Sequence, residues 1–170
     1  MQRIVSLLPK FLTFVFVLAL LPLGATAQPV TTNLHIPFAE TVVVPLADDI
    51  DTVSLSGFVH VVIHVSPPSP ISPPSPIRIH INLEQVSGVG DVTGLQYVAT
   101  GASRTDLPSI PTDPAIPLDL AFSLIPTDPI VPSDPVIPLD ISFLITFSIE
   151  TQQWSVEILS ASVPGPSPGD

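Results

Sequence analysis

Hydrophobic and polar residues alternate strictly along two stretches in the middle of the chain, residues 58–65 and 77–83. The odd-numbered positions of both stretches are aliphatic, and most even-numbered positions are polar. The aliphatic positions are Val59, Val61, Ile63, Val65, Ile77, Ile79, Ile81 and Leu83. Strict alternation predicts two half-buried β-strands. Their aliphatic faces coincide if the strands pair antiparallel with residue numbers that sum to an even value, such as 142 or 144.

Shorter segments flank this predicted hairpin. Residues 31–38 alternate too, and residues 40–46 follow almost at once. Each segment contains a proline, which cannot donate a hydrogen bond to a sheet ladder. Each is therefore expected to be an edge strand or to end at its proline. On the other side, a glycine-rich turn over residues 87–94 leads into a further strand that ends near Gly101.

Two duplications organise the remaining chain. Residues 110–122 recur as residues 131–143, and each copy is an Asp-Pro corner followed by an alternating strand. The apolar positions are Ile116, Leu118, Leu120, Phe122 and Leu124 in the first strand, and Ile137, Leu139, Ile141, Phe143, Ile145, Phe147 and Ile149 in the second. The other duplication, Ser-Pro-Pro-Ser-Pro-Ile, joins the central strands. We interpret residues 66–76 as a semi-rigid hairpin loop rather than as a docking site for a proline-recognition domain.

A last strand is expected from Trp154 to about Ser162, after a tight turn at residues 150–153. Trp154, Val156 and Ile158 fall on one side of it. Matching apolar faces predicts that Ile149 lies opposite Trp154 and that Phe147 lies opposite Val156.

The sequence therefore predicts an all-β fold of about eight mostly antiparallel strands, since no window carries a helical period. Such strands close into a β-barrel or stack as a two-sheet β-sandwich. Closure removes exposed sheet edges, so we expect a closed or partly open barrel, with the sandwich as the alternative. The predicted domain spans residues 28–162 and includes the proline-rich loop 66–76, and residues 163–170 are expected to be a disordered tail.

The first 27 residues have the features of a secretory signal peptide. Arg3 and Lys10 precede an apolar run over residues 11–24, and Ala25-Thr26-Ala27 is a small-residue cleavage site. The run of about 14 residues is shorter than the ~20 that cross a bilayer as a helix. We expect cleavage before Gln28 and export to the periplasm or the medium, without stable membrane insertion, rather than an uncleaved anchor.

Charge narrows the range of partners. Without residues 1–27 the chain keeps two of its four basic residues and all 15 acids, a net charge of 2 − 15 = −13. Such a chain repels phosphate backbones and anionic lipid, so we expect no nucleic-acid partner. The chain has no cysteine, which excludes disulfides and a thiol nucleophile.

The polar face of the predicted hairpin holds the candidate ligand-binding residues. They are His60, His64, Arg78, His80 and Asn82. Histidines on adjacent strands are potential zinc ligands, but residues four apart on a strand lie about 13 Å apart. His60 and His64 therefore cannot share one ion without a bulge. We interpret this face as solvated or cavity-lining and predict no metal site.

No motif indicates a catalytic residue or a cofactor. The glycines of residues 87–94 match neither the dinucleotide fingerprint nor the P-loop, and no EF-hand loop is present. The aspartates of the Asp-Pro corners are explained by turn chemistry. Asp119 and Asp140 are expected to point outward. We therefore predict that the protein has no cofactor.

One pattern resembles a known group of proteins. It comprises Ser56-Gly57, His60, His64, His80-Ile81-Asn82, Val86-Ser87-Gly88-Val89-Gly90, Thr93-Gly94, Tyr97 and Gly101. Over about 45 residues it resembles the core of small exported bacterial proteins of unknown function, many of which carry cysteines that are absent here. The resemblance implies an exported β fold and implies no mechanism.

These observations lead to two hypotheses about function. The first is an exported non-catalytic β-domain that binds a small apolar ligand or acts at the cell surface, because eight-stranded barrels can hold one small ligand. The alternative is an enzyme of isomerase or cyclase type that uses a histidine and a carboxylate inside the barrel. The face of the central hairpin that points inward distinguishes them.

Overall fold

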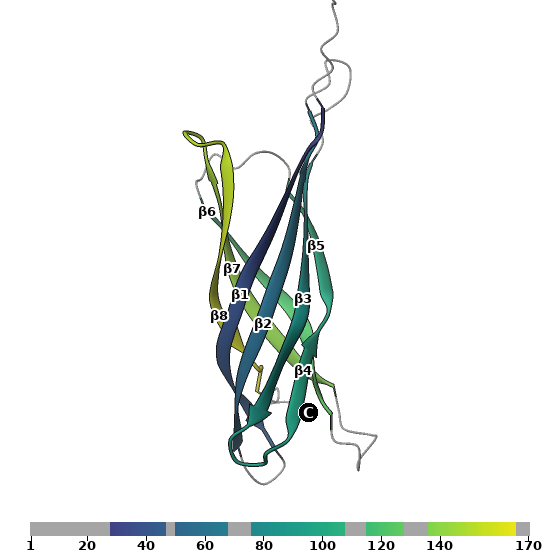
Figure 1. The fold of residues 1–170 in the computed structure, drawn as a ribbon, viewed down its shortest axis with the longest axis vertical. Coiled ribbons are helices and arrows are strands. Elements are labelled where there is room, and N and C mark those ends of the chain that lie inside the picture. Colours follow the sequence, from purple (N-terminus) through teal and green to yellow (C-terminus); the bar gives the residue numbers. More distant parts are fainter. Residues whose placement is uncertain (1–27, 47–49, 68–75, 108–114, 128–135, 166–170) are drawn as a thin grey trace, which may run out of the picture.

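The computed structural model describes residues 28–46, 50–67, 76–107, 115–127 and 136–165, and these residues form eight β-strands (Figure 1). The strands are β1 (Val30–Pro45), β2 (Ile50–Val65), β3 (Ile77–Gly90), β4 (Gln96–Thr100), β5 (Ala102–Leu107), β6 (Ala115–Pro126), β7 (Ile137–Ser148) and β8 (Gln153–Ser162). The prediction of an all-β fold is confirmed. In this part of the chain no helix is long and apolar enough to cross a membrane.

All eight strands belong to one sheet with the order β1-β2-β3-β4-β6-β7-β8, and β5 also pairs with β3. Every ladder is antiparallel. The sheet curls until β1 and β8 lie side by side, but no ladder joins these two strands among the described residues (Figure 1). The fold is therefore a nearly closed barrel, as predicted, and the β1–β8 boundary is its unsealed seam.

The seam follows from the number of strands that run around the barrel. β4 and β5 are two parts of one bent strand, because both pair with β3 and only Gly101, at a φ of 138°, separates them. Six antiparallel pairings then lead from β1 to β8. An even number of reversals makes β1 and β8 run in the same direction, whereas antiparallel barrels close with an even number of strands.

Prolines inside the strands lie where, among the described residues, a strand has a ladder partner on one side only. Pro37 lies in β1, at the seam, so its predicted edge position is confirmed, although β1 continues through it as one strand. Pro117 lies in the part of β6 that pairs with β7 alone, and Pro138 lies in the part of β7 beyond the reach of β8. A proline cannot donate to a ladder, so it is tolerated at such edges and blunts them.

The aliphatic face of the central hairpin points into the barrel. The β2–β3 register pairs Val59 with Leu83 and Val61 with Ile81, so the paired numbers sum to 142, as predicted. Val61 and Ile79 are completely buried, and the interior is filled by apolar side chains from β1, β2, β3, β4, β6, β7 and β8. The largest fully buried ones are Tyr97, Phe38, Phe143, Ile63, Ile77, Ile79, Ile81, Leu124, Leu139, Ile141 and Ile145.

A β-bulge interrupts the hairpin between residues 56 and 58 of β2. Here Gly57 alone faces two residues of β3, Gln85 and Val86. A Cβ atom on Gly57 would lie 2.6 Å from the Val86 Cα atom, so this position has no room for a side chain. Gln85 adopts a φ of 53°, and the extra residue moves the buried positions of β3 from odd to even numbers.

The register between β7 and β8 differs from the prediction by two residues. Phe147 lies opposite Trp154 and Ile145 opposite Val156, and the turn is formed by residues 149–152. Ile149 is therefore a turn residue with 77% of its surface exposed, not a partner of Trp154. The observed register brings the rings of Phe147 and Trp154 into contact, with centroids 4.8 Å apart. A two-residue shift keeps the predicted inward face of β8, because strand side chains repeat every two residues.

Several predictions concern parts of the chain outside the described residues. These parts are the signal peptide (1–27), most of the proline-rich loop (68–75), most of the Asp-Pro corners (108–114 and 128–135) and the end of the tail (166–170).

Candidate functional site

All five predicted ligand-binding residues lie on the outer surface of the barrel. His60, His64, Arg78, His80 and Asn82 alternate with the buried aliphatic positions of β2 and β3. The register places His60 beside Asn82 and His64 beside Arg78. The structure therefore brings these residues together, but on the outer wall of the barrel and not in its interior.

Around His64, near the end of β2, side chains of this face contact one another. The Nδ1 atom of His64 lies 2.9 Å from the hydroxyl oxygen of Thr31 on β1, within hydrogen-bond distance. The rings of His64 and His80 meet edge to face, with centroids 6.4 Å apart. One nitrogen of His64 is thereby engaged by Thr31, and His60 lies four residues away along β2, about 13 Å at the usual strand rise.

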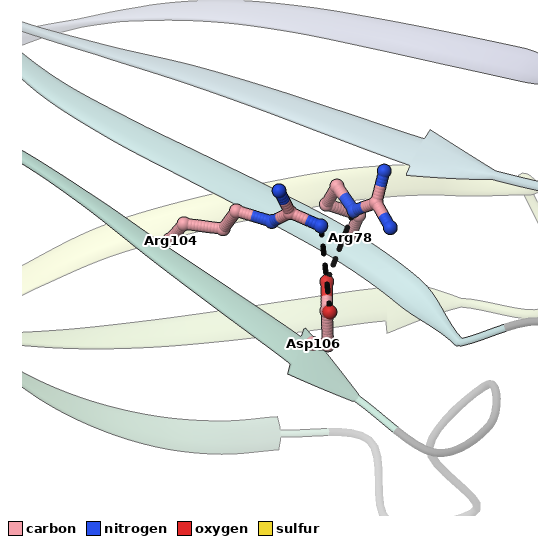
Figure 2. Close-up of polar contacts among 3 residues, drawn as sticks. All are labelled: Arg78, Arg104 and Asp106. Atoms are coloured by element: carbon pink, nitrogen blue, oxygen red, sulfur yellow. Dashed lines mark hydrogen bonds and ion pairs between the residues drawn. The ribbon is translucent and has the colours of Figure 1, made fainter.

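Arg78 already has a carboxylate partner. Its Nε atom donates to Asp106 Oδ1 at 3.2 Å, and the Nη2 atom of Arg104 lies 3.6 Å from Asp106 Oδ2 (Figure 2). Arg104 and Asp106 are both on β5, which pairs with β3. All three side chains are nearly half exposed, so each ion pair contributes little to stability. Asp106 is thus the carboxylate partner of both arginines of the predicted mature chain.

The same face also holds a compact cluster of two histidines and one glutamate, which we call the His–Glu cluster. It consists of His35 (β1), His60 (β2) and Glu84 (β3). His35 Nδ1 lies 3.6 Å from Glu84 Oε2, and His60 Nδ1 lies 3.2 Å from Glu84 Oε1. The two imidazole rings stack with centroids 4.4 Å apart and planes 14° apart. Both Nδ1 atoms thus lie against one carboxylate.

The strand registers explain this cluster. His35 lies directly opposite His60 in the β1–β2 ladder, and Glu84 lies opposite Phe58, just before the bulge at Gln85. The bulge leaves a hollow of about 400 Å³ lined by His35, Phe58, Glu84 and Gln85. The sequence analysis missed His35 and Glu84 because it did not assign a partner to the strand that contains His35. Pairing that strand with β2 would have placed the two histidines side by side.

A second hollow lies at the seam, where the start of β1 separates from the β7–β8 hairpin. This seam pocket has a volume of about 380 Å³ and is lined by Val30, Thr32, Val65, Phe147, Ile149, Gln152 and Trp154. Most of these side chains are apolar, and Trp154 is almost completely buried behind them. No sequence pattern indicated this pocket, because it depends on where the first and last strands meet.

No sequence pattern indicated a role for Asp51 either. It is the buried charged residue of the described chain, and it lies at the start of β2. Its carboxylate accepts hydrogen bonds from the backbone N–H of Val92, at 3.0 Å, and from the hydroxyl of Thr93. Burial raises the pKa of Asp51, but these hydrogen bonds outweigh it and hold the pKa below its ordinary value. Asp51 therefore holds the β3–β4 turn in place.

No family model, curated protein or solved structure matches the chain. The resemblance to small exported bacterial proteins therefore stays a prediction.

Proposed function

We propose that this protein is an exported, non-catalytic β-domain that binds a small apolar ligand in the seam pocket. The observation that carries the proposal is the apolar hollow beside Phe147 and Trp154. Export rests on the features of residues 1–27. Action at the cell surface is compatible with the same domain.

The size and lining of the seam pocket suit such a ligand. Its volume of about 380 Å³ lies in the range of small-molecule sites, roughly 300–1,000 Å³. Two aromatic rings and three aliphatic side chains supply apolar contact, while Thr32 and Gln152 supply polar groups that can orient one end of a ligand. The strongly negative chain disfavours anions. The best fit is therefore a neutral molecule with an apolar body and one polar end.

The filling of the barrel supports the non-catalytic proposal over an enzyme that works inside the barrel. Such an enzyme needs a histidine and a carboxylate facing inward. His60 and His80 face outward, and the inward positions next to them, Val59, Val61 and Ile79, are completely buried. The interior is occupied by the core that stabilises the fold.

Trp154 provides the test, because it is the only tryptophan of the chain and it lines the seam pocket. We expect 1-decanol, a neutral apolar probe, to change Trp154 fluorescence saturably and to raise the melting temperature, since a ligand of the native state stabilises it. Val65→Phe fills part of the pocket and should weaken binding at least tenfold. Val43→Phe is the matched control, because Val43 is exposed on β1 and does not line the pocket.

Two results would contradict the proposal. One is the absence of any saturable fluorescence change in the wild type. The other is equal binding by Val65→Phe and Val43→Phe, since that would place the probe elsewhere on the surface.

A further inference from the structure

We propose that the His–Glu cluster is a binding site for a divalent transition-metal ion, for which zinc is the best probe. The cluster offers two imidazole nitrogens and one carboxylate oxygen, and these three atoms lie within 4.8 Å of one another. This inference is independent of the seam pocket, because its residues are on the outer face of β1, β2 and β3.

The distances are close to those of a tetrahedral zinc site. Zinc–ligand bonds of about 2.0–2.1 Å place neighbouring ligand atoms about 3.3–3.4 Å apart. His60 Nδ1 lies 3.2 Å from Glu84 Oε1, and His35 Nδ1 lies 3.6 Å from Glu84 Oε2, so each imidazole is already near that separation from one carboxylate oxygen. No two of the three ligand atoms lie more than 4.8 Å apart, so the adjustment between any pair is at most about 1.4 Å (4.8 − 3.4). The side chain of His35 is 58% exposed, so its ring has room to turn.

The backbone holds the three ligands in place. Each comes from a different strand, and direct pairing within the β1–β2 ladder fixes His35 against His60. On β3, Glu84 is held by its pairing with Phe58, the last pair before the bulge at Gln85. Sites built on strands are positioned more accurately than sites on loops. Both Nδ1 atoms aim at the same carboxylate, and a cation can bind where these three groups converge.

The donor set indicates the kind of metal. Two imidazoles and a carboxylate form a known zinc ligand set that leaves a fourth position open. The hollow beside Phe58 and Gln85 is also lined by His35 and Glu84, so water can reach an ion bound there. The net negative charge of the chain favours the approach of a cation.

Zinc titration of the full mature chain tests the proposal by calorimetry and by thermal unfolding. We expect saturable binding of one ion and a rise in melting temperature. His35→Gln, His60→Gln and Glu84→Gln should each weaken binding at least tenfold. The matched controls are His64→Gln and His80→Gln, which change histidines on the same face outside the cluster and should bind as the wild type does.

Cobalt provides a second measurement, since tetrahedral Co²⁺ absorbs visible light strongly and should report the same loss in the cluster variants. Far-ultraviolet circular dichroism checks that each variant is folded, and 1-decanol binding should be unchanged in His60→Gln. The proposal is overturned if the wild type shows no saturable zinc binding. It is equally overturned if His64→Gln or His80→Gln weakens binding as much as His60→Gln does.

Discussion

Asp51 illustrates how single residues set local structure in this barrel. Its buried carboxylate on β2 accepts hydrogen bonds from the turn that joins β3 to β4. Gly90 makes room for it, because a Cβ atom at that position would clash with the Asp51 carboxylate. A buried carboxylate is favourable only when its hydrogen bonds are satisfied. Asp51, Gly90 and Thr93 therefore act together to fix the turn.

Asp51→Asn should lower the free energy of unfolding at neutral pH by about 1–3 kcal/mol, because it replaces hydrogen bonds to a charged acceptor by weaker ones. Urea unfolding measures the change. Asp91→Asn is the control, since Asp91 is exposed and its replacement should have an effect within about 0.5 kcal/mol. Equal effects of the two substitutions would show that the Asp51 carboxylate does not hold the turn.

The same comparison has a defined pH dependence. The pKa of Asp51 is lower in the folded protein than its ordinary value of 3.8. The stability that it contributes is therefore fully present above about pH 4 and is lost as the pH falls through the folded pKa. The difference in unfolding free energy between wild type and Asp51→Asn should stay constant from pH 7 to pH 5 and should shrink below pH 4. A difference that grows on acidification has the wrong sign for this account.

At the scale of the elements, alternation predicted which strand faces are buried, because a strand buries every second residue. This holds for the central hairpin and for the inward residues of β6 and β7 up to Phe147. Pairing registers were harder to predict. The Phe147–Trp154 pair differs by two residues from the prediction, since both registers bury the same face and the turn decides between them. The bulge at Gly57 depends on contacts that alternation does not encode.

Gly57→Ala tests the bulge. The added methyl group would meet the backbone of Gln85 and Val86 at 2.6–2.8 Å, which the ladder cannot relieve by moving a side chain. We expect a loss of about 2–4 kcal/mol in unfolding free energy, as for other overpacked or strained sites. Gly94→Ala is the control: its φ of 69° is strained for alanine, but nothing lies within 4 Å. It should cost about 1 kcal/mol. Similar losses for both glycines would contradict the steric explanation.

Alternation predicts the face of a strand but not its pairing partner, and this explains how much of the candidate sites could be predicted from the sequence. The histidines of the central hairpin were placed together on one polar face, and the structure confirms this. The His–Glu cluster also needs His35, whose position depends on pairing across a third strand. The seam pocket needs β1 and β8, whose meeting is set by the bend at Gly101 and by the direction of every strand between them. A local pattern of hydrophobic and polar residues does not predict which distant strands meet.

At the scale of the whole molecule, the number of strands around the barrel is odd when β4 and β5 are counted as one bent strand. This odd number explains both the seam and its pocket. β1 and β8 run in the same direction and share no ladder among the described residues. Their ends separate beside Trp154, where an apolar hollow remains. The rest of the interior is filled by apolar side chains, so the two proposed binding sites lie at the seam and on the outer wall. Both proposed sites require that the aliphatic face of the β2–β3 hairpin points into the barrel.

Two substitutions of neighbouring residues test this claim most directly. Val61 is completely buried, and Val62 is half-buried on the outer face opposite His80. Urea unfolding should show that Val61→Asp costs several kcal/mol or prevents folding, because it buries an unpaired carboxylate. Val62→Asp should cost less than about 1 kcal/mol. A greater loss for Val62→Asp than for Val61→Asp would contradict the account, since it would place the histidine-bearing face inside the barrel.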